Sequence, residues 1–397
     1  MSAAPGASGS PRRVAFVSNS ASGEYTGRLR WVEPLRARGF DVSFVLPEGE
    51  GAYVQRFNEK GVKVFQYAMD RSSQSLSGDL ASTRDLVRLI RAEKFDILHS
   101  FGHKANLCMG LAAMRLRSPV AFLHVTGLGS PFMPGGGAAR TLQRTFLRAY
   151  YRLAARKLSG LFFQNRDDEG DLGLSKGART FFAGSTGVDL DELDPATVKS
   201  ATLDVLRREL GIEGRVVLTY IGRLLKDKGV PELLQAAAGL HRNDPRVVLL
   251  VVGTPDPGNR NSIDPASIPG ATDEFARFLG RRDDIKEILA LTDIFVNPSS
   301  YREGVPRTNL EALAMGKPVV TANGPGCRDT IVEGETGFLI PPHDPRALES
   351  ALRKLIESDA LRARLGAAAR EDARLRFSVG TAVDRVASVY QEVLSRP

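Results

Sequence analysis

The stretch EGVPRTNLE, from Glu303 to Glu311, holds a glycine and a proline between two carboxylates. Gly304 lets the backbone approach a ligand closely, and Pro306 suits the first turn of a helix, where its missing N–H costs no hydrogen bond. Apolar residues at helical spacing then continue until Gly316, which is a typical helix end. The pattern therefore predicts a loop that leads into a helix, with Glu303 on the loop and Glu311 inside the helix.

The start of such a helix is a favourable place for an anion, because its first backbone N–H groups have no partner within the helix. A carboxylate beside an anion site suits a ligand that carries both phosphate groups and hydroxyl groups. A nucleotide sugar has both. We therefore expect its phosphates at the helix start and its hydroxyl groups near Glu303 and Glu311.

Outward from this stretch, short apolar runs alternate with helical patterns in both halves of the chain. Such alternation predicts an α/β fold with doubly wound parallel sheets, whose ligands lie at the carboxyl ends of the strands. The first half has strand patterns at 13–18, 41–46, 62–67, 96–99, 120–124 and 160–164, a polar loop at 19–26, and helical patterns at 29–38, 83–93, 107–115 and 138–158. The second half has strand patterns at 215–220, 247–252, 294–297, 319–322 and 337–340, and helical patterns at 230–240, 285–291, 347–357, 360–375 and 379–394.

The domain organisation follows from length and from two polar stretches. A chain of 397 residues is long enough for two domains with separate cores. Residues 1–11 are rich in small residues and are expected to be a disordered tail rather than a signal peptide. The polar, proline-containing stretch 191–203 is the expected linker between domains at 12–190 and 204–376, and 377–397 is expected to form a C-terminal helix that returns to the first domain.

Composition and cysteine usage restrict the class of protein. Apolar residues make up 42% of the chain and charged residues 25%, as in ordinary globular proteins. No run of about 18 apolar residues is present, so no membrane span is expected. Cys108 and Cys327 have no metal-ligand spacing, and a reduced, cytoplasmic location is expected.

The positive charge of the chain is concentrated in its first half. The net charge is +8 for the whole chain, and residues 97–166 contain ten Lys and Arg but no Asp or Glu. Within that span the helical pattern 138–158 carries arginines four residues apart, at Arg140, Arg144, Arg148 and Arg152. The helix is either an ordinary amphipathic helix or one that meets the headgroups of an anionic membrane. Nucleic acid is not expected as a partner, because no recognised binding module is present.

The second half opens with a pair of cations just after a strand. Arg223 and Lys228 lie between Gly222 and Gly229, after the strand pattern 215–220. Two cations at the carboxyl end of a strand can neutralise a diphosphate, and Arg can bind two of its oxygens at once. The alternative is a solvated turn with scattered charges. Because the 303–311 stretch follows two strands later in the same predicted sheet, we favour the phosphate site.

Taken together, these motifs resemble the retaining glycosyltransferases of family four, which have the GT-B fold. The resemblance covers nearly the whole chain and is strongest over 215–345. It implies two Rossmann-like domains that face a cleft, with the C-terminal helices packing back toward the first domain. Further motifs resemble a bacterial subgroup that assembles polysaccharides on lipid-linked sugars, with UDP-linked N-acetylhexosamines or hexoses as donors; they are Thr126-Gly-Leu-Gly129, Asp256–Asn259, Gly280–Asp284 and Tyr301–Arg307.

The resemblance also implies roles for individual residues. Arg223 and Lys228 would bind the donor diphosphate and stabilise it as the leaving group, Glu311 would hold the ribose, and Glu303 would contact the donor sugar near its anomeric carbon. The implied catalytic residues are Glu303, His124, Arg223 and Lys228. The implied donor-binding residues are Gly23, Arg223, Lys228, Arg281, Glu303, Gly304, Val305, Pro306, Arg307, Thr308 and Glu311. No metal ion and no cofactor beyond the nucleotide sugar are expected.

Two histidines of the first half are alternative candidates for a role near the sugar. His124 ends a strand pattern and precedes the 126–129 motif, but it could equally be a strand-end histidine bonded to the backbone. His103 follows the preceding strand and, with Lys104, could meet the phosphate of an acceptor. One departure from the family is the loop after the first strand, which has a single glycine, Gly23. Next to it, Glu24 would be unfavourable beside a phosphate.

These expectations combine into one function with three alternatives. The expected reaction is retaining transfer from a UDP-sugar to a polyprenyl-diphosphate-linked glycan, at the cytoplasmic, inner face of the cell membrane. The first domain would bind the acceptor and the second the donor. The alternatives are transfer to a small soluble acceptor, epimerisation of a nucleotide sugar, and non-catalytic binding of one.

Overall fold

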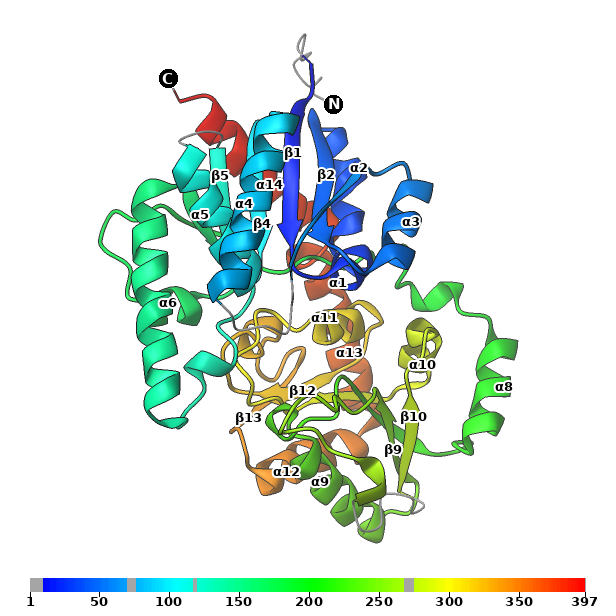
Figure 1. Cartoon of the computed structure of the whole chain (residues 1–397). Helices are drawn as coiled ribbons and strands as arrows, with labels where there is room; N and C mark the ends of the chain where they lie inside the picture. Colours follow the sequence, from blue (N-terminus) through cyan, green and yellow to red (C-terminus); the bar gives the residue numbers. More distant parts are fainter. Residues whose placement is uncertain (1–9, 70–75, 117–119, 268–274, 397) are drawn as a thin grey trace. The chain divides into compact units, whose positions relative to one another are not determined.

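A computed structural model describes residues 10–69, 76–116, 120–267 and 275–396, and the chain forms two compact units (Figure 1). Unit 1 consists of residues 1–186 together with 379–397, and unit 2 consists of residues 187–378. Unit 2 is therefore inserted between two segments of unit 1. Each unit contains one parallel β-sheet with helices between its strands, which confirms the predicted α/β fold class.

Unit 1 is built on seven parallel strands in the order β3-β2-β1-β4-β5-β6-β7. The central strands are buried on both faces, because they are apolar at successive positions rather than at alternate ones. In β1, Ala15 and Val17 face one core cluster while Val14 and Phe16 face another. The strands are β1 (Arg12–Ser18), β2 (Phe40–Pro47), β3 (Val64–Tyr67), β4 (Ile97–Phe101), β5 (Val120–Val125), β6 (Gly160–Phe163) and β7 (Thr180–Phe182).

Helices cover both faces of this sheet. Side chains of α4, α5 and α6 pack into the cluster that contains Ala15 and Val17, and side chains of α2, α3 and α14 pack into the cluster that contains Val14 and Phe16. The C-terminal helix α14 therefore completes the core of unit 1. The helices are α1 (Ala21–Thr26), α2 (Val32–Arg36), α3 (Gly51–Glu59), α4 (Leu76–Glu93), α5 (His103–Leu116), α6 (Gly137–Lys157), α7 (Arg166–Leu172) and α14 (Val379–Leu394).

Unit 2 has six parallel strands in the order β10-β9-β8-β11-β12-β13. Its strands are β8 (Val216–Ile221), β9 (Val247–Val252), β10 (Ala276–Gly280), β11 (Ile294–Asn297), β12 (Val319–Ala322) and β13 (Gly337–Ile340). Its helices are α8 (Ser200–Leu210), α9 (Val230–Asn243), α10 (Ile285–Leu291), α11 (Arg307–Ala314), α12 (Pro345–Ile356) and α13 (Asp359–Arg376).

The beginning of the chain differs from the prediction in two respects. The predicted polar loop 19–26 contains the short helix α1, in which the Ser20 hydroxyl accepts a hydrogen bond from the Gly23 amide at the N-cap. The helix predicted at 29–38 is divided into a 3₁₀ turn, Arg28–Trp31, and α2. Small polar residues that favour loops also favour N-caps, so their composition alone did not distinguish the two.

Two elements of unit 2 were not predicted. The end of the expected linker 191–203 runs into α8, which begins at Ser200 and packs Leu206 and Leu210 against the core. Strand β10 is an edge strand in which four of the five residues are partly exposed. The inner strands were predicted from continuous apolar runs. An edge strand that is partly exposed does not need such a run, so its sequence lacks that signal.

Both sheets have a topological switch point, where the strand order reverses direction. In unit 1 the switch lies between β1 and β4, and in unit 2 it lies between β8 and β11. The connections that leave two such strands diverge to opposite faces of the sheet, which leaves room for a ligand at their carboxyl ends. The fold therefore indicates candidate ligand sites at the loops after β1 and β4 in unit 1, and at those after β8 and β11 in unit 2.

Candidate active site

The loops after β8 and β11 bring Lys228 and Glu303 into direct contact. Lys228 ends the 3₁₀ turn that follows β8, and its ammonium group donates to the Glu303 carboxylate. The Ser299 hydroxyl also donates to Glu303 Oε1, at 3.1 Å. The two charged side chains are only 15% and 17% exposed, so water screens them weakly. The predicted cation and carboxylate thus lie together at the switch point of unit 2.

Two glycines allow these loops to pack against each other. Gly229 has a φ of +73°, and a Cβ there would lie 2.3 Å from the carbonyl oxygen of Pro298. Gly326, with a φ of +75°, would place a Cβ 1.5 Å from the carbonyl oxygen of Gly304. Gly326 therefore allows a close approach to Gly304 within the protein, and the approach of Gly304 to a ligand stays a prediction.

Helix α11 starts at the edge of this site and is anchored by a buried asparagine. Asn309 is fully buried, and its amide accepts from Asn297 at 2.7 Å. It donates to the hydroxyl groups of Thr321 at 3.2 Å and Thr330 at 3.0 Å. These bonds join the first turn of α11 to β11, to β12 and to the turn after β12. The sequence analysis did not identify Asn309, because its partners are distant in the chain.

The two other charged residues of α11 pair with each other. Arg307 Nε lies 2.9 Å from Glu311 Oε1, one helical turn along, and the Glu311 side chain is 10% exposed. Pro306 is the N-cap of α11 in an extended conformation, so the helix begins one residue later than the proline pattern indicated. The amides of Arg307 and Thr308 are therefore at the helix start.

Arg223 and Arg281 are more exposed than Lys228. Arg223 lies after β8 and donates to Asp256 at 2.8 Å, with 53% of its side chain exposed. Arg281 follows β10 and lies 3.7 Å from Asp283, with 73% of its side chain exposed. Because β9 separates β10 from β8, Arg281 lies two strands away from the switch point. Of the two arginines, the structure therefore places only Arg223 at the carboxyl end of β8.

At the switch point of unit 1, the carboxylate of Glu24 is turned into the protein. It accepts from Ser18 Oγ at 2.9 Å and from Arg28 at 2.7 Å, and it is 4% exposed. The Arg28 guanidinium in turn lies 3.7 Å above the ring of Phe101. The unfavourable carboxylate predicted beside a phosphate is thus neutralised by an internal ion pair. The amide of Gly23 donates to the Ser20 hydroxyl at 3.1 Å, and a role of Gly23 in donor binding stays a prediction.

His124 is a core residue in this structure. Its ring is fully buried, is stacked on His99 with a centroid distance of 5.3 Å, and has its Nδ1 3.2 Å from His99 Nε2. Tyr390 of α14 bonds to the other nitrogen of His99. Burial lowers the pKa of both histidines, and the nearby Arg28 lowers it further. The expected placement of His124 beside the sugar is therefore corrected: alternation along β5 turns its ring away from the edge and into the core.

His103, in contrast, lies at the edge of the sheet and holds the 126–129 motif. Its Nε2 is 3.1 Å from the Leu128 carbonyl, which can only accept, so Nε2 carries the proton. Its Nδ1 then accepts from Tyr151 of α6 at 2.9 Å, and Tyr151 accepts from Asn106 at 3.0 Å. Burial lowers the pKa of His103, which keeps the ring neutral. This chain of bonds connects α5 and α6 to the loop after β5.

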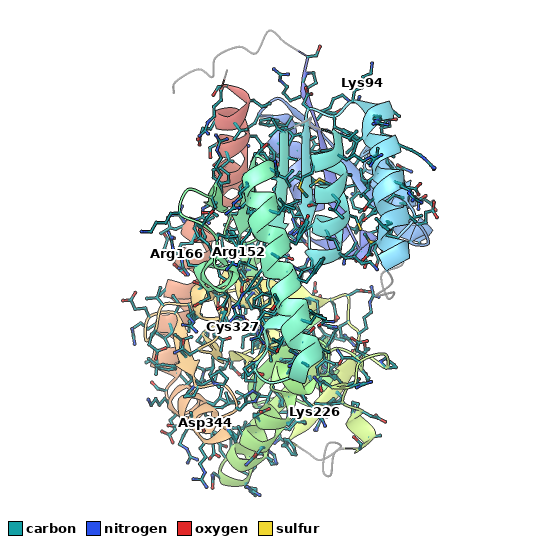
Figure 2. All side chains as sticks on the ribbon, turned by 60° about the vertical axis from the view of Figure 1, so that its left-hand side comes forward. Lys94, Arg152, Arg166, Lys226, Cys327 and Asp344 are labelled. Atoms are coloured by element: carbon teal, nitrogen blue, oxygen red, sulfur yellow. The ribbon has the colours of Figure 1, made fainter. Side chains whose placement is uncertain are left out.

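The basic residues predicted for an acceptor or a membrane also have partners within unit 1. Lys104 lies 3.5 Å from Asp79 of α4. The four arginines of α6 donate to backbone carbonyls of adjacent loops, which are those of Pro134 for Arg140, Pro131 and Met133 for Arg144, Asp171 for Arg148 and Gly173 for Arg152. The arginine stripe therefore braces the loops beside α6, and Figure 2 shows Arg152 on this helix.

Both halves of the chain match glycosyltransferase families. Residues 22–179 match the family described as glycosyl transferase 4-like domain, and residues 204–372 match the family described as glycosyl transferases group 1. The chain is 28% identical to N,N'-diacetylbacillosaminyl-diphospho-undecaprenol alpha-1,3-N-acetylgalactosaminyltransferase of Campylobacter jejuni, over 96% of this chain and 99% of that one. It is 26% identical to the capsular polysaccharide biosynthesis glycosyltransferase CapM of Staphylococcus aureus, over 91% and 93% of the two chains.

Solved structures show the same fold along almost the entire chain. Anabaena HepE in complex with UDP has a TM-score of 0.77 at 22% identity, over 96% of this chain and 100% of that one. Sucrose-phosphate synthase from Thermosynechococcus elongatus has a TM-score of 0.77 at 18% identity, over 97% and 99% of the two chains. With a family match in each half and this common architecture, the chain is a glycosyltransferase of the family-four type with the GT-B fold.

Proposed function

We propose that the protein transfers a sugar, an N-acetylhexosamine or a hexose, from a UDP-sugar to a lipid-linked glycan, with retention of configuration and without a metal ion. The observation that carries the proposal is the meeting of Lys228, Glu303 and the start of α11 at the switch point of unit 2. The Campylobacter relative, whose name specifies a diphospho-undecaprenol acceptor, supports the lipid-linked substrate. The UDP complex of HepE supports the nucleotide.

In this proposal the donor diphosphate binds between Lys228 and the amides at the start of α11. An ammonium group has three donors, so Lys228 can contact a phosphate oxygen while it keeps Glu303. Arg223 supplies a second positive charge. Glu311, held by Arg307 at 2.9 Å, is the proposed ligand of the ribose hydroxyls. Glu303 is the proposed contact to the sugar, since Ser299 and Lys228 fix its carboxylate at the loop.

The proposed reaction exchanges one bond at the anomeric carbon for another and moves one proton. The bond between the anomeric carbon and the diphosphate oxygen breaks, and the two cations and the helix start stabilise the negative charge that develops on the diphosphate. The acceptor hydroxyl oxygen forms its bond to the same face of the anomeric carbon, and its proton goes to the departing phosphate oxygen. Attack on the same face, which the family resemblance implies, gives retention.

The proposed acceptor binds to unit 1 at the cytoplasmic face of the membrane. No helix among the described residues is long and apolar enough to cross a bilayer. In this proposal the association with the membrane is peripheral and rests on surface contacts. The excess of Lys and Arg in residues 97–166 supports an anionic acceptor or surface for this unit.

The proposal is tested by sugar transfer from UDP-N-acetylhexosamines and UDP-hexoses to a polyprenyl-diphosphate-linked sugar. We expect Lys228→Ala to lower kcat/KM by about 10²- to 10³-fold, because a group that stabilises the leaving charge is lost. Glu303→Ala is expected to lower it by at least about tenfold, because a transition-state contact is lost. Lys226→Ala, an exposed lysine of the same turn, is the matched control (Figure 2) and should retain activity. Near-full activity of both site variants would contradict the assignment.

A further inference from the structure

Unit 1 carries an apolar groove on its surface. The groove lies between α4, α5 and α6 and has a volume of about 460 Å³. It is lined by Asp79, Leu80, Leu107, Leu111, Phe146, Ala149, Tyr150 and Leu153. Asp79, the acidic member of the lining, is paired with Lys104. The groove is thus an almost entirely apolar depression on the surface of unit 1.

One wall of the groove continues into an exposed apolar stripe along α6. Leu142, Phe146, Ala149 and Leu153 follow one another at spacings of four, three and four residues, which places them on one face of the helix. The side chains of Leu142, Phe146 and Leu153 are 71%, 49% and 47% exposed. The opposite face of α6 buries Tyr150, Tyr151, Ala154 and Ala155 in the core. The helix is therefore apolar on two faces, although a surface helix needs only one.

A leucine of α4 extends the exposed apolar stripe of α6. Leu80 of α4 is 54% exposed and lines the same groove. Contiguous exposed apolar surface of this kind marks a place where a protein meets a membrane or a partner. Leu80 and the three large side chains of α6 together form what we call the α4–α6 apolar face, which consists of Leu80, Leu142, Phe146 and Leu153.

Positive charges border one end of this face, and further ones lie on another side of α6. Arg152, Arg156 and Lys157 are exposed at the C-terminal end of the stripe. Arg140, Arg144 and Arg148 lie on the same helix and donate to carbonyl oxygens, which carry no full negative charge, so the guanidinium charges persist. An apolar stripe bordered by Arg and Lys is the arrangement of a helix that lies in the interface of an anionic bilayer.

We propose that the α4–α6 apolar face inserts into the surface of an anionic membrane, with α6 lying in the plane of the interface. This inference rests on the proposed lipid-linked acceptor, because a transferase acting on such a lipid must reach it at the bilayer. The apolar stripe makes the contact with the hydrocarbon. The arginine stripe, which braces adjacent loops, contributes long-range attraction to the anionic headgroups.

The position of the face also connects it to the acceptor edge of unit 1. Tyr151 lies on α6 between Phe146 and Leu153 and donates its hydroxyl to His103, which holds the carbonyl of Leu128. The helix that meets the membrane is thus joined by two hydrogen bonds to the loop after β5. An acceptor sugar at that loop would be close in the protein to the lipid surface that presents it.

Vesicle co-sedimentation of the full chain tests the inference. The vesicles contain phosphatidylcholine either alone or with about 30% phosphatidylglycerol, which supplies the anionic surface. We expect the wild-type chain to bind the anionic vesicles, and Phe146→Glu/Leu153→Glu to reduce binding by at least about tenfold. Leu375→Glu replaces a leucine of unit 2 that is 58% exposed, and it is the matched control that should bind like the wild type. Circular dichroism melting checks that each variant is folded.

Three results would overturn the inference. The first is that the double variant binds anionic vesicles like the wild type. The second is that the wild type binds neutral vesicles equally well. The third is that sedimentation equilibrium shows a dimer for the wild type and a monomer for the double variant. The last result would assign the face to a second copy of the chain.

Failure of this inference is distinguishable from failure of the proposed function. Transfer to a short-chain, water-soluble lipid-diphosphate sugar should be unchanged in Phe146→Glu/Leu153→Glu, while transfer to the same sugar on a long-chain lipid in vesicles should fall. Loss of both activities in the double variant would contradict the membrane role. A wild-type chain that transfers sugar to neither acceptor would contradict the proposed function, and the vesicle-binding result would still decide the role of the face.

Discussion

Asn309 is the residue that makes the start of α11 a fixed rather than a mobile site. It is fully buried and its amide has three side-chain partners, Asn297, Thr321 and Thr330. The sequence alone could predict a helix after Pro306 because that signal is local. It could not predict the anchor, because the partners are 12, 12 and 21 residues away and meet Asn309 only after the sheet has formed. A preorganised helix start loses less entropy when it binds an anion.

Replacing Asn309 should therefore lower the stability of unit 2. Asn309→Ala leaves the buried amide of Asn297 and two hydroxyl groups without this partner, and we expect a loss of about 2–3 kcal/mol in the free energy of unfolding. Urea denaturation measures the change. Asn243→Ala, an exposed residue whose amide donates to the Gly239 carbonyl, should stay within about 0.5 kcal/mol of the wild type. Equal losses in both variants would argue against the anchoring role.

The two histidines of β4 and β5 show where sequence reasoning at the residue scale succeeded and where it failed. His99 was expected in the core and is fully buried there. His124 was expected at the ligand because it ends a strand, but alternation places it on the same face of the sheet as His99. The position of a residue at the end of a strand predicts that it lies near the edge of the sheet. The face of the sheet to which its side chain points depends on the register of the strand, and its burial depends on the helix that covers that face.

At the scale of elements, β4, β5 and α14 share one buried polar chain. Tyr390 of α14 bonds to His99, and His99 bonds to His124. Both rings are fully buried, and burial lowers the pKa of each. This arrangement is stable only with neutral imidazoles, so the attachment of α14 to the sheet depends on the protonation of residues in two strands.

Unit 1 should consequently lose stability in mild acid. The histidines His99, His103 and His124 have lowered pKa values when folded, so the unfolded chain binds more protons below its own histidine pKa of about 6.5. The free energy of unfolding therefore falls as the pH drops below about 6.5, by up to about 1.4 kcal/mol per pH unit for each histidine. Above that pH all three are neutral in both states and contribute no slope.

Denaturation at a series of pH values checks this dependence. His124→Phe removes one titrating ring from the stack and should reduce the slope between about pH 6.5 and 5 by roughly one third. Phe162→Leu changes a non-titrating member of the same stack and should lower stability equally at each pH. An unchanged slope in His124→Phe would show that this histidine is not held neutral by the fold.

At the scale of the whole molecule, each unit contains one buried cysteine. Cys108 lies in the core of unit 1 and Cys327 in the core of unit 2. Burial raises the pKa of Cys108 to about 11 and that of Cys327 to about 12, so neither thiol is a nucleophile at neutral pH while its unit is folded. Labelling of each cysteine therefore reports the unfolding of its own unit.

Because each cysteine reports on its own unit, labelling can test the division of the chain into two units. A chain that ends at Ser378 lacks α14 and with it the buried side chains of Val383, Val386 and Tyr390 from the core of unit 1. We expect Cys108 to react with a thiol reagent at least about tenfold faster in the truncated chain, because removing several large core side chains costs more than a small unit can lose. Cys327 should remain protected. Mass spectrometry of the labelled peptides measures both rates, and joint exposure of the two cysteines would contradict the division.

The insertion of unit 2 between two segments of unit 1 also sets an order for biosynthesis. When Ser378 has been translated, unit 2 has its complete sequence, whereas unit 1 still lacks α14. Until α14 has been synthesised, the first segment of unit 1 exposes the apolar surface that α14 will cover and is a substrate for chaperones. Unit 1 therefore begins before unit 2 in synthesis, but its core can be completed only after unit 2 has been translated.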